Sequence, residues 1–66
     1  MTALELGRNI AKLRRAQSLS QKELAKMVWI SVSYLSKIEE GSCSRPHMKT
    51  LSRIALALNV SIDELD

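Results

Sequence analysis

The chain has 66 residues, 45% hydrophobic and 26% charged, which is typical of one small globular domain covering residues 1–66. Two glycines, one proline and no low-complexity tract argue against a disordered tail, and no apolar run approaches the roughly 18 residues of a membrane span. Residues 1–10 lack the basic-then-apolar order of a signal peptide, so we expect a cytoplasmic protein.

The charges are distributed unevenly. All ten lysines and arginines lie in residues 1–56, which carry a net charge of +6, whereas residues 57–66 carry −3. The basic part favours a polyanion as partner, although many solvated helical surfaces are mildly basic.

The sequence offers no evident catalytic chemistry. Cys43 is the only cysteine, which agrees with a reducing compartment, and His47 alone does not complete the three or four ligands of a metal site. There is no Ser/His/Asp set, no carboxylate pair in a pocket-like setting and no Gly-rich phosphate loop. We therefore expect a protein that is not an enzyme and has no catalytic residue, metal or cofactor.

The first predicted element is a helix over about residues 3–16. Leu6, Ile10 and Leu13 recur at helical spacing, and Thr2 with Glu5 fits a capping box, in which two side chains satisfy free N–H groups at a helix start.

The second predicted helix covers about residues 21–28. Ser20 and Glu23 repeat the capping box, and the apolar face comprises Leu24, Ala25 and Val28. A joint at Trp29 follows.

The third predicted helix covers about residues 32–40. Ser31 is suited to cap its start, Leu35 and Ile38 form its apolar face, and Gly41 is suited to the left-handed conformation that ends a helix.

Residues 41–46 are predicted to form a loop before a fourth helix that ends at Asn59 and has an apolar face of Leu51, Ile54, Ala55 and Leu58. Ser61 and Glu64 begin a fifth helix, and no segment alternates with period two. The pattern predicts an all-α, compact bundle of about five short helices.

Two short helices joined by about three residues, the second ending at glycine, are typical of a helix-turn-helix. In that motif the second helix can lie in the DNA major groove. The same apolar spacing also fits a generic helical bundle, so periodicity alone leaves both interpretations open.

The sequence resembles the lambda-repressor-like, or Xre-type, helix-turn-helix domains of bacterial and phage repressors. The resemblance covers nearly the whole chain, through "LGRNIAKLRRAQSLSQKELAKMV", "ISVSYLSKIEEG" and "RPHMKTLSRIALALNVSIDEL". It implies a sequence-specific, double-stranded DNA-binding transcriptional regulator, a repressor that reads the major groove with residues 32–40. The alternative is an adaptor or antitoxin of the same fold whose chief partner is a protein.

The resemblance implies base contacts from Ser31, Val32, Ser33 and Lys37 at the start of the third helix and one turn further on. Lys37 can donate to guanine, the serines can donate or accept, and Val32 can pack against a thymine methyl group. The alternatives are that Ser31 acts only as a cap and that Val32 is partly buried.

Gln21 matches a family glutamine that contacts a phosphate while bracing the recognition helix. Its alternative is a solvated side chain in the first turn. Further candidates for phosphate contacts are Tyr34, Ser36, Ser42, Ser44 and Arg45.

Arg14 and Glu39 match the structural ion pair by which this family often ties its first helix to the end of the third. Family members commonly bind palindromic operators as homodimers, and Ile62 and Leu65 are our candidate dimer contacts. The alternative for both residues is packing onto the core of their own domain.

Trp29 departs from the resemblance, because the family usually has glycine at this turn position, where φ tends to be positive. The indole either folds over neighbouring apolar and lysine side chains or contacts a partner protein or a second subunit.

Overall fold

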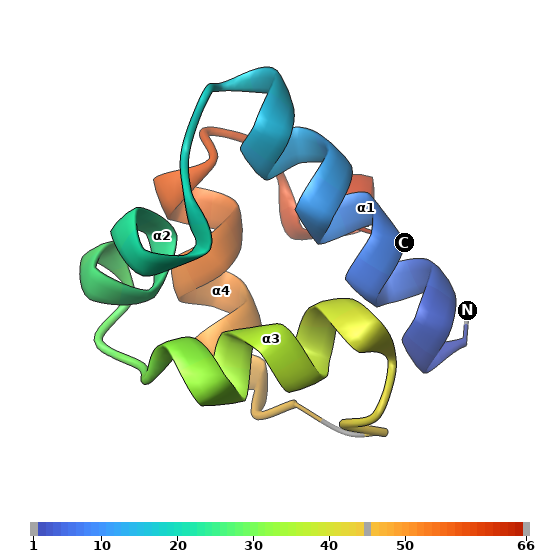
Figure 1. Cartoon of the computed structure of the whole chain (residues 1–66). Helices are drawn as coiled ribbons and strands as arrows, with labels where there is room; N and C mark the ends of the chain where they lie inside the picture. Colours follow the sequence, from blue (N-terminus) through green and yellow to red (C-terminus); the bar gives the residue numbers. More distant parts are fainter. Residues whose placement is uncertain (1, 45, 66) are drawn as a thin grey trace.

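The computed structural model describes residues 2–44 and 46–65 and contains four α-helices followed by one 3-10 turn (Figure 1). These elements are α1 (Ala3–Ala16), α2 (Gln21–Met27), α3 (Val32–Glu40), α4 (Met48–Ala57) and η1 (Ile62–Leu65). The all-α class is confirmed, and the described ranges contain no strand. None of their helices is long and apolar enough to cross a bilayer.

The predicted helix starts are confirmed in α1, α2 and α3. The hydroxyl groups of Thr2 and Ser20 accept the N–H groups of Glu5 and Glu23 at 3.1 and 3.0 Å, and both glutamates bond back to the cap N–H. Helices α1 and α3 have the predicted bounds, whereas α2 ends one residue early, at Met27.

The predicted fifth helix is only a single turn. The N–H of Glu64 donates to the carbonyl of Ser61 at 3.1 Å, and the carboxylate of Glu64 accepts the N–H of Ser61 at 3.0 Å. Four residues, Ile62–Leu65, accommodate this 3-10 bonding but no further α-helical turn.

All four α-helices end in the same way, with a Schellman motif. Just after each helix a single residue adopts a left-handed conformation. The N–H of the residue that follows it donates to the carbonyl of the residue five positions earlier in the chain, at 3.0 or 3.1 Å. The left-handed residues are Ser18, Trp29, Gly41 and Asn59, with φ of 58°, 64°, 81° and 58°.

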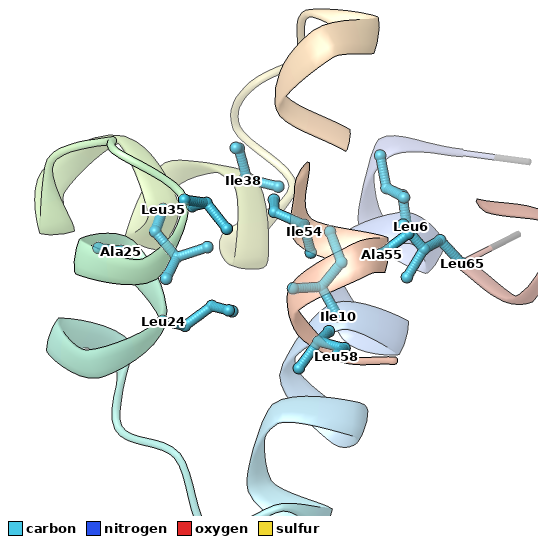
Figure 2. Close-up of a cluster of buried hydrophobic side chains, with 11 residues drawn as sticks. Leu6, Ile10, Leu24, Ala25, Leu35, Ile38, Ile54, Ala55, Leu58 and Leu65 are labelled. Atoms are coloured by element: carbon cyan, nitrogen blue, oxygen red, sulfur yellow. The ribbon is translucent and has the colours of Figure 1, made fainter. Parts of the chain in front are cut away.

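The core lies where the inner faces of the helices meet (Figure 2). Helix α1 supplies Leu6 and Ile10, and helices α2 and α3 supply Leu24, Leu35 and Ile38, among others. The remaining buried apolar residues of this cluster are Ala25, Val28, Ile54, Ala55, Leu58 and Leu65.

Helix α1 approaches α3 closely at Gly7. A Cβ at this position would lie 2.3 Å from the carbonyl oxygen of Ile38 and 2.6 Å from that of Glu39. Any larger residue would therefore separate the two helices. This role of Gly7 was not predicted from the sequence.

The candidate dimer contact at Leu65 is corrected. Its side chain is 1% exposed and belongs to the core, and its carbonyl accepts a hydrogen bond from Asn9 Nδ2 at 2.9 Å. The closing turn folds back onto α1, which removes Leu65 from any surface that a second copy could reach. Ile62, on the same turn, stays 38% exposed.

Candidate nucleic-acid interface

Helices α2 and α3 form a helix-turn-helix with a fixed turn. The N–H of Ile30 donates to the carbonyl of Ala25 at 3.0 Å, across the left-handed Trp29. Ser31 Oγ then accepts the N–H of Tyr34 at 3.0 Å and caps α3. Trp29 thus adopts the positive φ that glycine usually supplies, so the turn keeps its geometry despite the bulky residue.

The outer face of α3 carries the four side chains predicted to contact bases. Ser31, Val32, Ser33 and Lys37 are all exposed, and Val32 has 42% of its surface accessible. The inner face of the same helix is anchored in the core by its buried leucine and isoleucine. Ser31 also acts as a cap, and its hydroxyl hydrogen remains available to a second acceptor.

A network of hydrogen bonds connects α1, α2 and α3. Arg14 Nε and Nη2 donate to the two carboxylate oxygens of Glu39 at 2.8 and 3.0 Å, and Nη1 donates to the carbonyl of Leu19 at 2.8 Å. Gln21 Nε2 donates to Glu39 Oε1 at 2.9 Å. The network therefore links the start of α2 and the end of α3 to one arginine of α1.

The Arg14–Glu39 pair is enclosed, with only 8% and 5% of the two side chains exposed. The hydrogen bond to Glu39 raises the pKa of the Arg14 guanidinium, assisted by the charge of that carboxylate and opposed by burial. The fork of guanidinium N–H groups matches both oxygens of a carboxylate and still reaches a third acceptor, which a lysine ammonium on one flexible stem does not reproduce.

A groove beside this network brings together residues from three helices. Arg8 and Arg15 lie two turns apart on the exposed side of α1, and the small Ala11 lies between them. Gln21 and Ser36, both predicted phosphate contacts, line the same groove. We call this the α1–α3 groove. Its remaining lining residues are Glu39 and Glu40.

The electrostatics of the α1–α3 groove are basic. Glu39 is neutralised by Arg14, and neither Arg8 nor Arg15 forms an ion pair within the described ranges. Glu40 supplies an opposing negative charge and accepts a hydrogen bond from Ser36 at 3.4 Å. Neither Arg8 nor Arg15 was among the predicted site residues, although their seven-residue spacing indicates a shared helix face.

The other predicted phosphate contacts are dispersed. Tyr34 is half-buried against the core, whereas Ser42 and Ser44 are exposed in the loop after α3. Ser42 Oγ donates to the carbonyl of Lys37 at 3.3 Å. Arg45 lies outside the described residues. Of the five candidates that the structure describes, it therefore groups Gln21 and Ser36 in this groove.

Within residues 2–44 and 46–65 no three His, Cys, Asp or Glu side chains are placed to hold a metal ion. Cys43 is half-buried, and the described ranges offer it no cysteine partner.

Two capped helices, a rigid turn and an exposed third-helix face define the chain as a helix-turn-helix domain. It belongs to the HTH_3 helix-turn-helix family, whose model matches residues 10–65.

Curated relatives with similar sequences support this assignment. The chain is 43% identical over 61 residues to the ImmF control region 10 kDa protein of Bacillus phage phi105, covering 92% of this chain and 67% of the phage protein. It is 37% identical over 60 residues to the transcriptional regulator SlrR of Bacillus subtilis, covering 91% of this chain and 40% of SlrR.

Solved structures share the fold. The restriction-modification controller protein C.AhdI of Aeromonas hydrophila superposes with a TM-score of 0.91 and 28% identity, covering 97% of this chain and 96% of that protein. SinR of Bacillus subtilis, described as the master regulator for biofilm formation and solved in complex with DNA, has a TM-score of 0.86 and 32% identity. That match covers 91% of this chain and 95% of the SinR chain.

Proposed function

We propose that the protein is a sequence-specific, double-stranded DNA-binding transcriptional regulator that acts in the cytoplasm as a repressor. The observation that carries the proposal is the exposed outer face of α3, held by a buried inner face and by the Arg14–Glu39 pair. In this proposal α3 enters the major groove, where a protruding helix fits and where base edges are distinguishable. The DNA complex of SinR supports the partner class.

In the proposed complex Lys37 donates to guanine O6 or N7, Val32 packs against a thymine methyl group, and Ser31 and Ser33 bond to base edges. Each of these side chains is short or makes a single contact. Sequence preference should therefore rest on several modest contacts rather than on one bidentate pair.

We assign backbone recognition to the α1–α3 groove. A phosphate there would meet Gln21 and Ser36 together with the guanidinium groups of Arg8 and Arg15. Phosphate contacts of this kind fix the position of a protein on the duplex and carry no sequence information directly. The exposed Ser42, Ser44 and the sequence-predicted Tyr34 and Arg45 remain candidates for neighbouring phosphates.

We further propose that two copies bind a palindromic operator as a homodimer. A 66-residue monomer offers little surface for tight binding, and twofold dimers match half-sites about one helical turn apart. Ile62 remains the candidate dimer contact because it is exposed beside the acidic residues of η1.

Selection of bound DNA from a random pool, at two salt concentrations, tests the proposal. We expect an enriched sequence with twofold symmetry and an affinity that falls steeply with salt. Lys37→Ala should relax the base preference at one position of each half-site, whereas Arg15→Gln should lower the affinity for all sequences about equally. A pool without enrichment, bound weakly at both salt concentrations, would favour the adaptor or antitoxin function instead.

A protein partner as a second function is favoured by one observation, the exposed apolar surface around Trp29. SinR has also been solved in a complex with the SinI protein, so a structurally similar regulator is seen with a protein partner.

A further inference from the structure

An apolar groove lies between the end of α2 and the outer side of α4. It is lined by Met27, Trp29, Arg53, Leu56 and Ala57, and we call it the Trp29 groove. Trp29 and Leu56, with 85% and 81% of their surfaces exposed, are the two most exposed large hydrophobic side chains in the described ranges. Met27 is a third exposed hydrophobic residue of this groove, with 49% of its surface accessible. Clustered exposed hydrophobic residues from two separate elements mark an interaction surface rather than ordinary scatter.

Trp29 adopts a left-handed backbone conformation, which is sterically unfavourable for a residue with a side chain. The three other left-handed helix ends carry Ser18, Gly41 and Asn59, all small or polar residues that tolerate this conformation better than tryptophan. An indole that is 85% exposed also makes few contacts that could offset the strain. Large aromatic side chains in such positions are typical of binding anchors.

The charges around the Trp29 groove are positive. Arg53 is the one charged residue among the described residues that line it, and the exposed Lys26 directly precedes Met27. The other charge of α4, Lys49, is exposed one turn before Arg53, and the helix contains no acidic residue. The surface therefore combines three apolar anchors with a basic border.

We propose that the Trp29 groove binds an acidic amphipathic helix of a partner protein. The apolar face of that helix would cover Met27, Trp29 and Leu56, and its carboxylates would face Arg53 and Lys26. A groove between two helices is a common receptor for an amphipathic helix, and complementary charge selects the partner. DNA is a poorer occupant because phosphates gain nothing from exposed methionine and leucine side chains, and duplex bases are already stacked.

A second copy of the chain is the main competing occupant. Its closing turn, η1, carries exposed Ile62 with Asp63 and Glu64, and lies behind α1 in Figure 1, away from the turn after α2. Contact between two such different patches would be heterologous and would join copies head to tail. Sedimentation distinguishes this case from a partner protein.

The experiment is a selection of binders from a displayed library of random peptides, using the full chain. We expect the enriched peptides to be acidic, with apolar residues at helical spacing. The chain's sole tryptophan reports on binding directly, because covering Trp29 shifts its fluorescence emission to shorter wavelength. Leu56→Ser should lower the affinity for a selected peptide by about tenfold or more, as expected for an interface anchor.

The control is Met48→Ser, which removes an apolar side chain that is 66% exposed but lies outside the groove, and should leave peptide affinity unchanged. Arg53→Glu should lower the affinity for acidic peptides. Circular dichroism shows whether each variant is folded. Leu56→Ser should also retain DNA binding, which separates this proposal from the proposed DNA-binding function.

Three outcomes would overturn the proposal. The first is enrichment of basic or uncharged peptides, and the second is peptide binding that Leu56→Ser and Arg53→Glu leave unchanged. The third is wild-type chain that self-associates in sedimentation while Leu56→Ser stays monomeric, which would assign the groove to a second copy.

Discussion

Arg14 is a buried, charged side chain that donates hydrogen bonds to residues outside its own helix. Two go to the carboxylate of Glu39 and one to the carbonyl of Leu19. The pair was predicted from family resemblance alone. Spacing within the sequence could not have identified it, because the partners are far apart in the chain and meet only through the crossing of α1 and α3.

Arg14→Ala should lower the free energy of unfolding by about 3 to 5 kcal/mol, because Glu39 keeps its enclosed charge and loses its partner. Thermal and urea melts measure the effect. Arg15→Ala, at an exposed position on the same helix, is the matched control and should change stability little. An unchanged melt for Arg14→Ala would contradict the assigned role of the pair.

Gly7 gives a second prediction at this scale. In an exposed helix interior, Gly→Ala typically adds up to about 1 kcal/mol of stability. Here we expect a loss of about 1 to 3 kcal/mol, because the new Cβ would lie 2.3 Å from the carbonyl oxygen of Ile38 and would push α1 away from α3.

Chemical denaturation of Gly7→Ala checks this prediction, with Ala16→Gly at the exposed end of α1 as a control for helix propensity. A stabilised Gly7→Ala protein would mean that α1 and α3 do not approach each other closely. The sequence could not reveal this constraint, since a mid-helix glycine has the same local pattern whether or not a second helix crosses there.

At the scale of the elements, local signals located most helix ends. The capping boxes at Thr2 and Ser20 and the cap at Ser31 gave the starts of α1, α2 and α3, and Gly41 gave the end of α3, because these signals involve residues within one turn. The closing turn was less predictable. Its acidic, apolar pattern fitted either a dimer contact or the core, and only the fold shows that Leu65 turns inward while Ile62 stays exposed.

Trp29→Gly should raise the free energy of unfolding by about 1 kcal/mol, because glycine adopts φ of 64° without the steric cost that tryptophan meets. Part of this gain is lost to the greater freedom of glycine in the unfolded chain. DNA affinity should be nearly unchanged. Urea denaturation and a DNA-binding titration measure the two quantities.

Gly41→Ala is the opposing control at an equivalent helix end. It should destabilise the fold, since φ is 81° and the added Cβ would lie 2.9 Å from the Cα of Leu4. A large loss of stability in Trp29→Gly would instead show that the indole supports the fold.

The cap of α2 should make stability depend on pH. The hydrogen bond that the backbone N–H of Ser20 donates to the Glu23 carboxylate at 2.9 Å, and after it the side chain of Ser20, lower the pKa of Glu23 below its ordinary value of 4.5. Because the pKa of Glu23 is lower in the folded than in the unfolded chain, its charge stabilises the fold fully at a pH above the unfolded-state pKa. This stabilisation is lost as the pH falls through the folded-state pKa. Glu23→Gln retains the cap geometry, so its stability should fall less between neutral and acidic pH.

Parallel melts of wild type and Glu23→Gln across the acidic range check this expectation. Equal loss of stability in both proteins would assign the acid sensitivity to other carboxyl groups.

At the scale of the whole molecule, the family and the all-α class could be predicted from the sequence. The grouping of Arg8, Arg15, Gln21 and Ser36 in one groove could not, because it depends on how three helices pack. The α1–α3 groove makes a quantitative prediction for DNA binding. The plot of log affinity against log salt has a negative slope, and Arg8→Gln and Arg15→Gln should each make it shallower by about 0.9, as expected when one phosphate fewer is neutralised.

Binding titrations over a range of salt concentrations provide the measurement. Arg53→Gln, in α4 and outside the lining of the α1–α3 groove, is the control and should leave the slope unchanged. Glu40→Gln should raise affinity, since it removes the one unneutralised acid of the groove. If the slopes of Arg8→Gln and Arg15→Gln equal that of the Arg53→Gln control, these two arginines of α1 do not contact DNA phosphates.

The repeated helix endings also limit how the domain can be controlled. After α1, α2 and α4 the chain turns through a few residues whose backbone is already hydrogen-bonded, so these joints leave little freedom for a hinge. A domain of this kind has few alternative conformations for an effector to select. We therefore expect that its activity changes by competition for its surfaces or by the pairing of copies, and not by an internal allosteric transition.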